Sequence, residues 1–207
     1  MNIIILGDKY QKGMKSKGCP ALIKLSKNSN ILQQQYKILK HRFPQSNIVY
    51  VGGFEFKKIQ NFLSNNKLDI ELIYNDKYDE YNDSYALSLV GKYLDSDILI
   101  VFGYHILNNK IFNKFDISDG SQVFISDNSD SNIGCVLEDN KILNISFNLP
   151  NKINHIYYLT SHATESMRLY TDNLNFRNYF IFEIINSLTD NITFKTFFTH
   201  SGVNYVA

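Results

Sequence analysis

Short apolar runs alternate with segments of helical periodicity through the first half of the chain, and this alternation restricts the folds open to it. The apolar runs have the length and residue types of buried strands: Asn2–Leu6, Asn47–Val51, Ile70–Tyr74 and Asp97–Phe102. Runs that are apolar on both faces are typical of parallel sheets covered by helices on each side. Repeated strand–helix–strand units therefore predict right-handed crossovers and a doubly wound, mostly parallel α/β fold.

The segments between these runs carry the signals of helices. One helix is expected to begin near Ile31, where apolar residues share one face, and to end before Pro44. Two shorter helices are expected near Glu55–Leu63 and near Ser84–Leu94. These helices supply the crossovers that a parallel sheet requires.

The second half of the chain changes character and adds a small antiparallel β structure. Strands are expected at Gln122–Ser126, Ile133–Leu137, Lys141–Ser146, His155–Leu159 and Thr193–Thr199. The turn Glu138-Asp139-Asn140 joins two of them, because Asp and Asn tolerate turn geometry. Helices are expected near Ala163–Tyr170 and Phe176–Leu188. No linker or repeat divides the chain, so residues 1–207 are interpreted as a single domain.

Charge and composition exclude several classes of partner. The formal net charge is +1, with 21 basic and 20 acidic residues, so neither nucleic acid nor an anionic membrane is expected as a partner. No apolar run approaches the ~20 residues that span a bilayer, and no secretory signal is visible. The two cysteines, Cys19 and Cys135, have no metal-site spacing. We therefore expect a cytoplasmic protein with reduced thiols.

Ligands of doubly wound sheets bind beyond the carboxyl ends of the strands. Three loops are therefore expected to converge on one site: Gly7–Pro20, Asn75–Ser84 and Gly103–Leu107. The first loop is rich in Gly and carries four lysines that either cradle phosphate or are simply solvated: Lys9, Lys12, Lys15 and Lys17. The acidic residues of the second loop allow a cation site or a solvated surface: Asp76, Asp79, Glu80 and Asp83. In the third loop, His105 is interpreted either as structural or as an acid, base or ligand.

The order and spacing of these elements resemble nucleotidyltransferases with the GT-A-like fold, above all the sugar-1-phosphate nucleotidyltransferases and the phosphocholine cytidylyltransferases. Ile31–Ile59 is similar to the helix–strand–Gly–helix unit of that family, and Ile70–Leu94 is similar to its strand, Asn-containing loop and helix. DILIVFGY, at Asp97–Tyr104, stands where the family has a strand that ends in Gly-Asp. IGCVLEDNKILNIS resembles the family's hairpin, and NYFIFEIINSL its late helix. The resemblance covers nearly the whole chain.

The resemblance also implies what the site needs and what this chain lacks. In the family, an Arg and a Lys of the first loop neutralise the nucleotide phosphates, and two Asp residues hold Mg²⁺. Here the Arg is absent, Ala21 replaces the Lys after Pro20, and Tyr104 replaces the first Asp. The second Asp is expected after the last strand, where the sequence reads VNYVA. A phenol is a poor Mg²⁺ ligand, so no catalytic residue and no metal ligand is assigned.

Two functions remain open. One is a nucleotidyltransferase-fold protein that has lost metal-dependent transfer. Such a protein binds a nucleotide or phosphorylated metabolite, or serves as a structural subunit in a larger assembly such as a virion. The other is an active enzyme that makes an NDP-sugar or a CDP-choline-like product with Mg²⁺ at an altered site. The candidate nucleotide-binding residues are Gly7, Asp8, Lys9, Lys12, Gly13, Lys15, Asn75, Asn82 and Tyr104.

Overall fold

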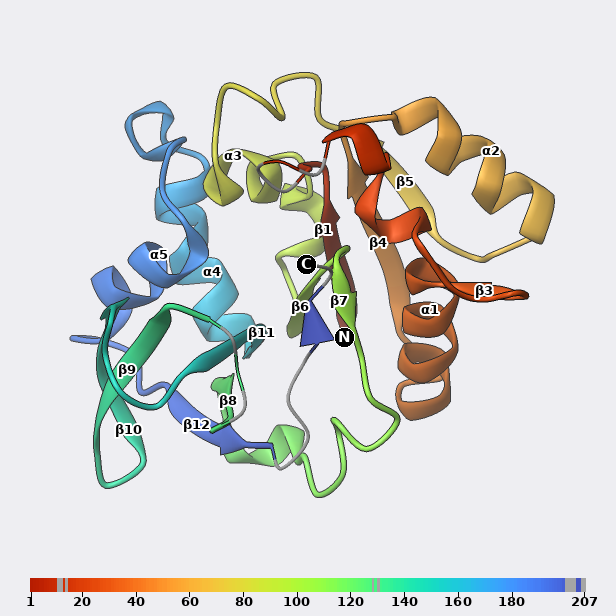
Figure 1. Cartoon of the computed structure of the whole chain (residues 1–207). Helices are drawn as coiled ribbons and strands as arrows, with labels where there is room; N and C mark the ends of the chain where they lie inside the picture. The colour runs from red at the N-terminus through yellow and green to blue at the C-terminus, as the bar shows by residue number, and fades with distance from the viewer. Residues whose placement is uncertain (11–12, 14, 128, 130, 200–203, 206–207) are drawn as a thin grey trace.

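The structure is a computed structural model that describes residues 1–10, 13, 15–127, 129, 131–199 and the backbone of 204–205. Its centre is a nine-stranded sheet in the order β5-β4-β1-β6-β11-β8-β12-β10-β9 (Figure 1). The strands are β1 (Asn2–Gly7), β4 (Asn47–Gly52), β5 (Glu71–Tyr74), β6 (Ile98–Phe102), β8 (Gln122–Ile125), β9 (Ile133–Glu138), β10 (Lys141–Phe147), β11 (Ile153–Leu159) and β12 (Lys195–Phe198).

The parallel half of the sheet is the half predicted from the apolar runs. β1 pairs in parallel with β4 on one side and with β6 on the other, and β4 pairs in parallel with β5. Asn2 lies opposite both Asn47 and Ile98, so these three strands start in register. The predicted doubly wound parallel sheet is confirmed.

The second half of the chain continues the same sheet, mostly with antiparallel pairs. β11 is antiparallel to both β6 and β8, and β9 and β10 form an antiparallel hairpin. The hairpin turns at Asp139 and Asn140, which both have positive φ, as the sequence predicted for this turn. β12 is parallel to β8 and antiparallel to β10, so it joins the hairpin to the rest of the sheet. Two small antiparallel pairs stand apart: β2 (Lys24–Ser26) with β3 (Ser29–Asn30), and β7 (His105–Ile106) with β13 (Asn204–Tyr205).

Five α-helices cover the sheet: α1 (Ile31–Arg42), α2 (Phe56–Asn66), α3 (Asp83–Ser88), α4 (Ser161–Thr171) and α5 (Ile181–Leu188). Five 3₁₀ turns accompany them: Lys15–Lys17, Pro20–Leu22, Gly91–Tyr93, Ile117–Asp119 and Leu174–Phe176. α1 begins where predicted because Asn30 and Gln33 form a reciprocal capping box. The Asn30 side chain accepts from Gln33 N at 2.9 Å, and the Gln33 side chain accepts from Asn30 N at 3.3 Å.

Two helices are shorter than the sequence patterns suggested. The segment predicted as one helix near Ser84–Leu94 is divided, because α3 ends at Ser88 and a separate 3₁₀ turn begins at Gly91. The second difference is at Phe176–Leu188, where the α-helix begins only at Ile181. There the Glu183 carboxylate accepts from Phe180 N at 2.7 Å and fixes Phe180 as the residue before the first turn.

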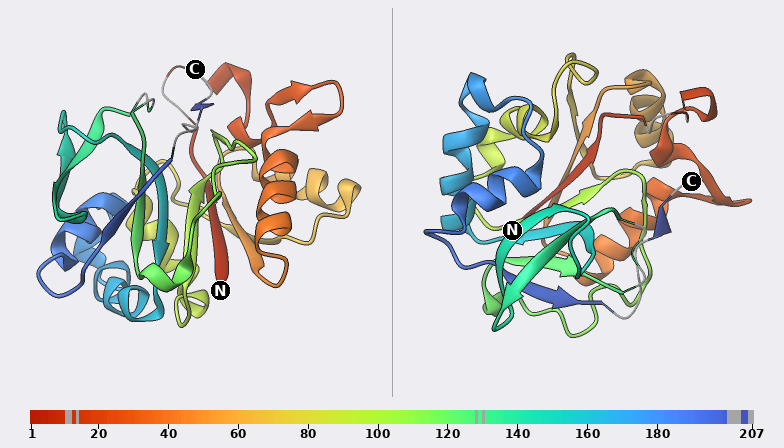
Figure 2. Two further views of the ribbon diagram at one scale, coloured as in Figure 1. Left: turned by 90° about the horizontal axis from the view of Figure 1, so that it is seen from below. Right: turned by 60° about the vertical axis from the view of Figure 1, so that its left-hand side comes forward.

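Alternate residues of β1 pack into two separate cores, one on each face of the sheet. Ile4 and Leu6 pack in one core with side chains of α3, α4 and α5, whereas Ile3 and Ile5 pack in the other with side chains of α1 and α2. The views in Figures 1 and 2 show these two groups of helices on opposite faces. Helices on both faces were predicted and are confirmed. In the part of the chain that the structure describes, no helix combines the length and the apolar character needed to cross a bilayer.

Candidate functional site

A cavity of about 240 Å³ lies at the carboxyl ends of β1 and β6, next to Leu6 and Phe102. The three loops that were predicted to converge all reach it: the first through Asp8, Lys9 and Tyr10, the second through Asp83, and the third through Tyr104. The second half of the chain supplies the opposite wall, formed by Ile133, His155, Tyr157, Phe180 and Phe182. The convergence follows from the topology, because parallel strands bring their carboxyl ends to one edge of the sheet.

Asp8 is a buried carboxylate that is tied to the second loop. The Asn75 amide donates to Asp8 Oδ2 at 2.8 Å, and Asn75 itself is fully buried. Asn75 also accepts from Lys77 N at 2.9 Å, and its own backbone N donates to Gly52 O at 2.8 Å. Burial raises the pKa of Asp8, and the nearby charge of Lys9 opposes that rise. Asn75 therefore fixes Asp8 from behind the cavity wall.

Lys9 contributes a positive charge to the cavity. Its ammonium donates to Asn82 Oδ1 at 2.7 Å. Asn82 is held in turn, because its amide donates to Asn178 O at 2.9 Å. Burial raises the pKa of both Asp8 and Asp83, and the charge of Lys9 opposes the rise at both carboxyl groups. The predicted residues Lys9 and Asn82 thus form one hydrogen-bonded pair at the rim.

Asp83, the first residue of α3, is the second carboxyl group of the cavity. Its Oδ2 accepts from Ile181 N at 3.3 Å, which links α3 to the start of α5. Burial raises the pKa of Asp83 to about 7, with Lys9 opposing and Asp8 adding to the rise. Near pH 7 this carboxyl group is therefore partly protonated and partly ionised. The sequence placed Asp83 in an acidic loop but did not single it out for the cavity.

Tyr104 lines the cavity directly beyond β6, and α1 fixes the turn that carries it. Gln35 is fully buried, and its Nε2 donates to Phe102 O and to His105 O, both at 2.8 Å. The ring of Tyr104 packs at 5.3 Å from the ring of Phe102 and edge-on at 4.9 Å from His105. The Gln35 amide therefore holds the two carbonyls on either side of Tyr104.

His105 lies behind the cavity wall and does not line it. The side chain is fully buried, and its Nδ1 accepts from Phe102 N at 3.3 Å. Burial lowers the pKa of His105 well below its usual value, with a further contribution from His155. The imidazole is therefore neutral at pH 7. Of the two interpretations offered by the sequence, this geometry favours the structural one.

Three further predicted residues of the first loop, Gly7, Gly13 and Lys15, do not line the cavity. Gly7 ends β1, and its carbonyl accepts from the buried Tyr50 hydroxyl at 3.1 Å. Gly13 has a φ of 81°, in the left-handed region that favours glycine. The Lys15 ammonium lies 5.4 Å from the centre of the Tyr10 ring, in a cation–π contact. Lys12 lies outside the described residues.

The aromatic wall that the second half of the chain supplies was not predicted from the sequence. Phe180 lies in the segment Phe176–Leu188 that was expected to be helical, but it precedes α5, is 39% exposed, and stacks at 5.8 Å on Phe182. His155 was expected only as the first residue of a strand. It has a φ of 51°, unusual for a residue with a side chain, and its Nε2 lies 2.9 Å from Ser131 Oγ. Burial lowers the pKa of His155 to about 4, so it is neutral at pH 7. In the sequence, the sign of this wall was the pair of phenylalanines in the run Phe180-Ile181-Phe182.

Four side chains at this cavity bear on whether it could hold Mg²⁺. Asp8 and Asp83 already accept from protein N–H groups, Lys9 places a positive charge beside both, and Tyr104 offers only a phenol. Within the described ranges, no group of three or more His, Cys, Asp or Glu side chains could hold a metal. Asp76 and Asp79 are exposed and do not line the cavity.

Comparison of the fold with solved structures identifies similar chains, and the three described here share little sequence with this one. CTP:phosphocholine cytidylyltransferase from Streptococcus pneumoniae superposes with a TM-score of 0.79 at 16% identity, over 99% of this chain and 92% of that one. The inositol-1-phosphate CTP transferase from T. maritima gives 0.73 at 14% identity, over 95% and 84%. HddC from Yersinia pseudotuberculosis, solved in complex with GMP-PN, gives 0.72 at 14% identity, over 99% and 92%.

These likenesses confirm the nucleotidyltransferase-type fold that the sequence resemblance implied. They extend over nearly the whole chain and include both halves of the sheet. No protein-family profile matches the sequence, and no curated protein matches it significantly. At identities of 16% and below, the comparison concerns the fold alone.

Proposed function

We propose that this chain binds a nucleotide or a phosphorylated metabolite at the cavity beyond β1 and β6 and does not catalyse metal-dependent nucleotidyl transfer. One observation carries the proposal: the two carboxyl groups at the cavity are bound to protein donors and lie beside Lys9, while a tyrosine stands at the end of β6. A site built to bridge Mg²⁺ and phosphate needs carboxylates open to the metal. This cavity instead offers aromatic walls and one ammonium group.

The size and lining of the cavity suggest which part of the ligand binds in the cavity and which part binds along the first loop. A volume of about 240 Å³ is smaller than a typical small-molecule site of ~300–1,000 Å³. The cavity therefore takes one ring or headgroup of the ligand, against aromatic side chains such as Tyr10 and Tyr104. The phosphates lie outside it along the Gly7–Lys17 loop, where Lys9 and Lys15 are within reach.

The charge state of the cavity determines the pH dependence of binding. The charge of the cavity depends on whether Asp83 holds its proton. The pKa of Asp83 is about 7, so acidification through neutral pH removes a negative charge from the cavity. An anionic ligand whose own charge is the same at both pH values therefore binds more tightly at pH 6 than at pH 8.

An active nucleotidyltransferase is the second candidate. The observation in its favour is that two carboxyl groups, Asp8 and Asp83, reach the same cavity in a fold shared with CTP-using enzymes. Such an enzyme joins a nucleoside triphosphate to a phosphorylated sugar or alcohol and releases pyrophosphate. A structural or virion role also stays a prediction, without a particular surface to support it.

The deciding experiment measures binding and turnover on the same preparation. Calorimetric titration with CTP, UTP, ATP and GTP, with and without Mg²⁺, is combined with a pyrophosphate-release assay containing phosphocholine or a sugar 1-phosphate. We expect binding of at least one nucleotide that does not require Mg²⁺, and no pyrophosphate release. Turnover that EDTA abolishes would establish the enzyme instead. No binding of any nucleotide or of the two phosphorylated compounds would refute both candidates.

Two single variants test whether the measured binding takes place at the cavity. Lys9→Met removes the ammonium at the rim, and Lys27→Met removes the same charge from the exposed turn between β2 and β3. We expect Lys9→Met to weaken binding about tenfold, which corresponds to about 1.4 kcal/mol. Lys27→Met should leave the affinity unchanged. Equal effects of the two variants would mean that the ligand responds only to overall charge.

A further inference from the structure

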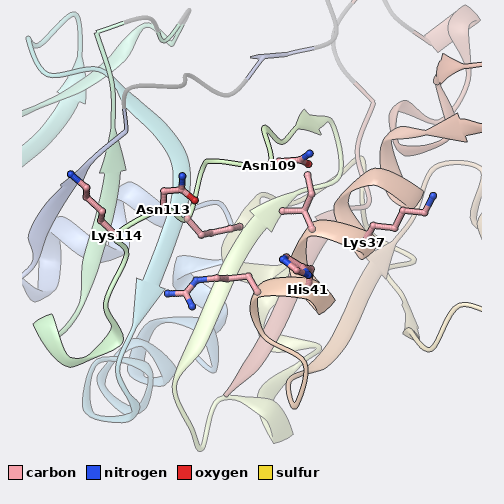
Figure 3. A pocket seen from close by; sticks show the side chains of 8 residues that line it. Lys37, His41, Asn109, Asn113 and Lys114 are labelled. Carbon is pink, nitrogen blue, oxygen red and sulfur yellow. The ribbon is translucent and has the colours of Figure 1, made fainter.

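A second and larger hollow lies beside α1, and it shares no residue with the strand-end cavity. It has a volume of about 760 Å³ and lies between the C-terminal half of α1 and residues 109–114 (Figure 3). Figure 3 shows Lys37 and Lys114 at its two sides, with His41, Asn109 and Asn113 between them. We propose that this α1 groove binds a multiply charged organic anion that carries phosphate groups. The proposal does not depend on the function proposed for the cavity.

The charge of the groove departs from the balance of the whole chain. The chain has 21 basic and 20 acidic residues, yet the lining of the groove includes Lys37, Arg42 and Lys114 and no carboxylate. None of these three side chains takes part in an ion pair among the residues that the structure describes. Arg42 interacts electrostatically with Asp116, a residue outside the lining, whose pKa is lowered mainly by hydrogen bonds from Ser118 and to a smaller extent by the charge of Arg42. The lining itself supplies no negative charge, so its three cations attract an anion.

The helix dipole explains only part of this charge. Basic residues in the last turn of α1, such as His41 and Arg42, stabilise the negative end of the helix. Lys37 lies before that last turn, and Lys114 comes from a different segment. The groove thus combines cations from two elements, which a dipole effect on α1 does not require.

Arg42 is held in place before any ligand arrives. Its Nη2 donates to Phe115 O at 2.7 Å, and its guanidinium lies 5.5 Å from the centre of the Phe43 ring. A guanidinium has five N–H donors in a rigid fork, so one bond to a carbonyl leaves others to bind an anion. Fixing this side chain in advance lowers the entropy cost of binding.

The floor of the groove is apolar and rigid. Ile38 and Phe112 are almost fully buried beneath it. The Phe112 ring packs edge-on at 5.3 Å from Phe43 and at 5.8 Å from Phe124, within the core of this face. Asn109 and Asn113 also line the groove, and a side-chain amide can both donate and accept hydrogen bonds.

These features together define the class of ligand. A volume of about 760 Å³ is within the usual range for small-molecule sites. The cationic rim matches two or more negative charges, and the apolar floor matches a flat organic group attached to them. We therefore expect an organic polyphosphate to bind more tightly than the same phosphates without the organic group.

The test uses ATP and inorganic triphosphate as probes, both without Mg²⁺, on the full chain. Binding is followed by NMR from the backbone amide signals of residues 37–42 and 109–114, which report this groove separately from the cavity. We expect both probes to shift these signals, and ATP to do so at lower concentration. Signals that stay unchanged at millimolar probe would refute the site. Equal affinity of the two probes would refute the role of the apolar floor.

A matched pair of double variants tests the cations. Lys37→Gln with Lys114→Gln removes two charges from the groove and leaves Arg42 and its bond to Phe115 intact. Lys24→Gln with Lys27→Gln removes two charges from the exposed β2–β3 hairpin. We expect the groove variant to bind ATP about tenfold more weakly at this site, which corresponds to about 1.4 kcal/mol. The hairpin variant should bind normally, and an equal loss in both would overturn the proposal.

The other outcomes separate this site from its alternatives. Lys9→Met, at the strand-end cavity, should leave the shifts of residues 109–114 unchanged, whether or not the cavity binds nucleotide. A single-stranded oligonucleotide or an acidic peptide that competes with ATP at these residues and binds more tightly than ATP would assign the groove to a macromolecule. That result would overturn the small-molecule proposal.

Discussion

The Asn75 amide and the Asp8 carboxylate form a 2.8 Å hydrogen bond between two buried side chains that lie 67 positions apart in the sequence. Asp8 follows β1 and Asn75 follows β5, which are separated in the sheet by β4. The bond therefore spans the end of β4 and joins the first loop of the cavity to the second.

Asn75→Leu should destabilise the protein by about 2–3 kcal/mol. The substitution removes a donor to a buried carboxylate and also the acceptor for Lys77 N, and groups left without partners are costly. Urea denaturation of Asn75→Leu, Asp8→Leu and the double variant gives the coupling between the two sites. We expect the double variant to lose clearly less than the sum of the single losses. Additive losses would show that the bond contributes little.

Asp83 should make the protein less stable as the pH rises toward 8. The folded carboxyl has a pKa of about 7, raised from 3.8 mainly by burial, so the folded state holds its proton where the unfolded state has lost it. The stabilising contribution is complete below pH 4 and is lost as the pH rises through 7. Asp83→Asn removes this titration. The urea midpoint of the wild type should therefore fall relative to that of the variant between pH 5 and pH 8, and parallel curves would contradict the assignment.

Gly7→Ala should destabilise the protein by about 3 kcal/mol or more. A Cβ at Gly7 would overlap the phenol group of Tyr50, which is fully buried and cannot move aside. Tyr50→Phe alone should cost about 1 kcal/mol through the lost bond to Gly7 O, and it should not rescue Gly7→Ala, because the ring itself also overlaps.

The control for this prediction is Gly91→Ala. A Cβ at Gly91 has no neighbour within 4 Å, so this variant should unfold close to the wild-type midpoint. Tyr50→Val, combined with Gly7→Ala, should recover part of the loss attributed to the overlap. If Gly91→Ala were as unstable as Gly7→Ala, the cost would come from the loss of glycine flexibility and not from Tyr50.

Gln35→Leu should weaken both the fold and ligand binding. The substitution leaves Phe102 O and His105 O without the Gln35 donor, at an expected cost of about 2 kcal/mol. Because these carbonyls flank Tyr104, nucleotide affinity should fall more than it does for Gln60→Leu, an exposed substitution on α2. Denaturation and calorimetry on the two variants measure both effects. Unchanged nucleotide affinity in folded Gln35→Leu would remove Tyr104 from the site.

The parallel half of the fold could be predicted from the sequence because its signals are local. Each of the runs at β1, β4 and β6 is apolar on both faces, and this pattern is visible in the sequence without knowing which strands lie beside it. The start of α5 was predicted too early, because it depends on a hydrogen bond and not on a local pattern of apolar residues. Phe176 and Phe180 have the spacing of a helical stripe, but the Glu183 bond to Phe180 N places the start of α5 after both.

The candidate site also has one part that local patterns predicted and another that they did not. Because ligands bind beyond the carboxyl ends of parallel strands, the loops that carry Asp8, Lys9 and Tyr104 were expected to meet, and these three residues line one cavity. Asn75 and Asn82 come from the second of these loops and form hydrogen bonds with Asp8 and Lys9. The opposite wall depends on β11 pairing with β6, a contact between residues about 60 positions apart that no local pattern reveals. His155 and Phe182 reach the cavity only through such long-range packing, so sequence reasoning could not place them.

The position of β12 has a consequence for how the chain is made. This strand lies between β8 and β10, although every other strand of the sheet precedes it in the sequence. β12 can pair with β8 and with β10 only after residues 195–198 have left the exit tunnel of the ribosome. Until then, the strand edges of β8 and β10 that face β12 in the finished sheet lack this partner.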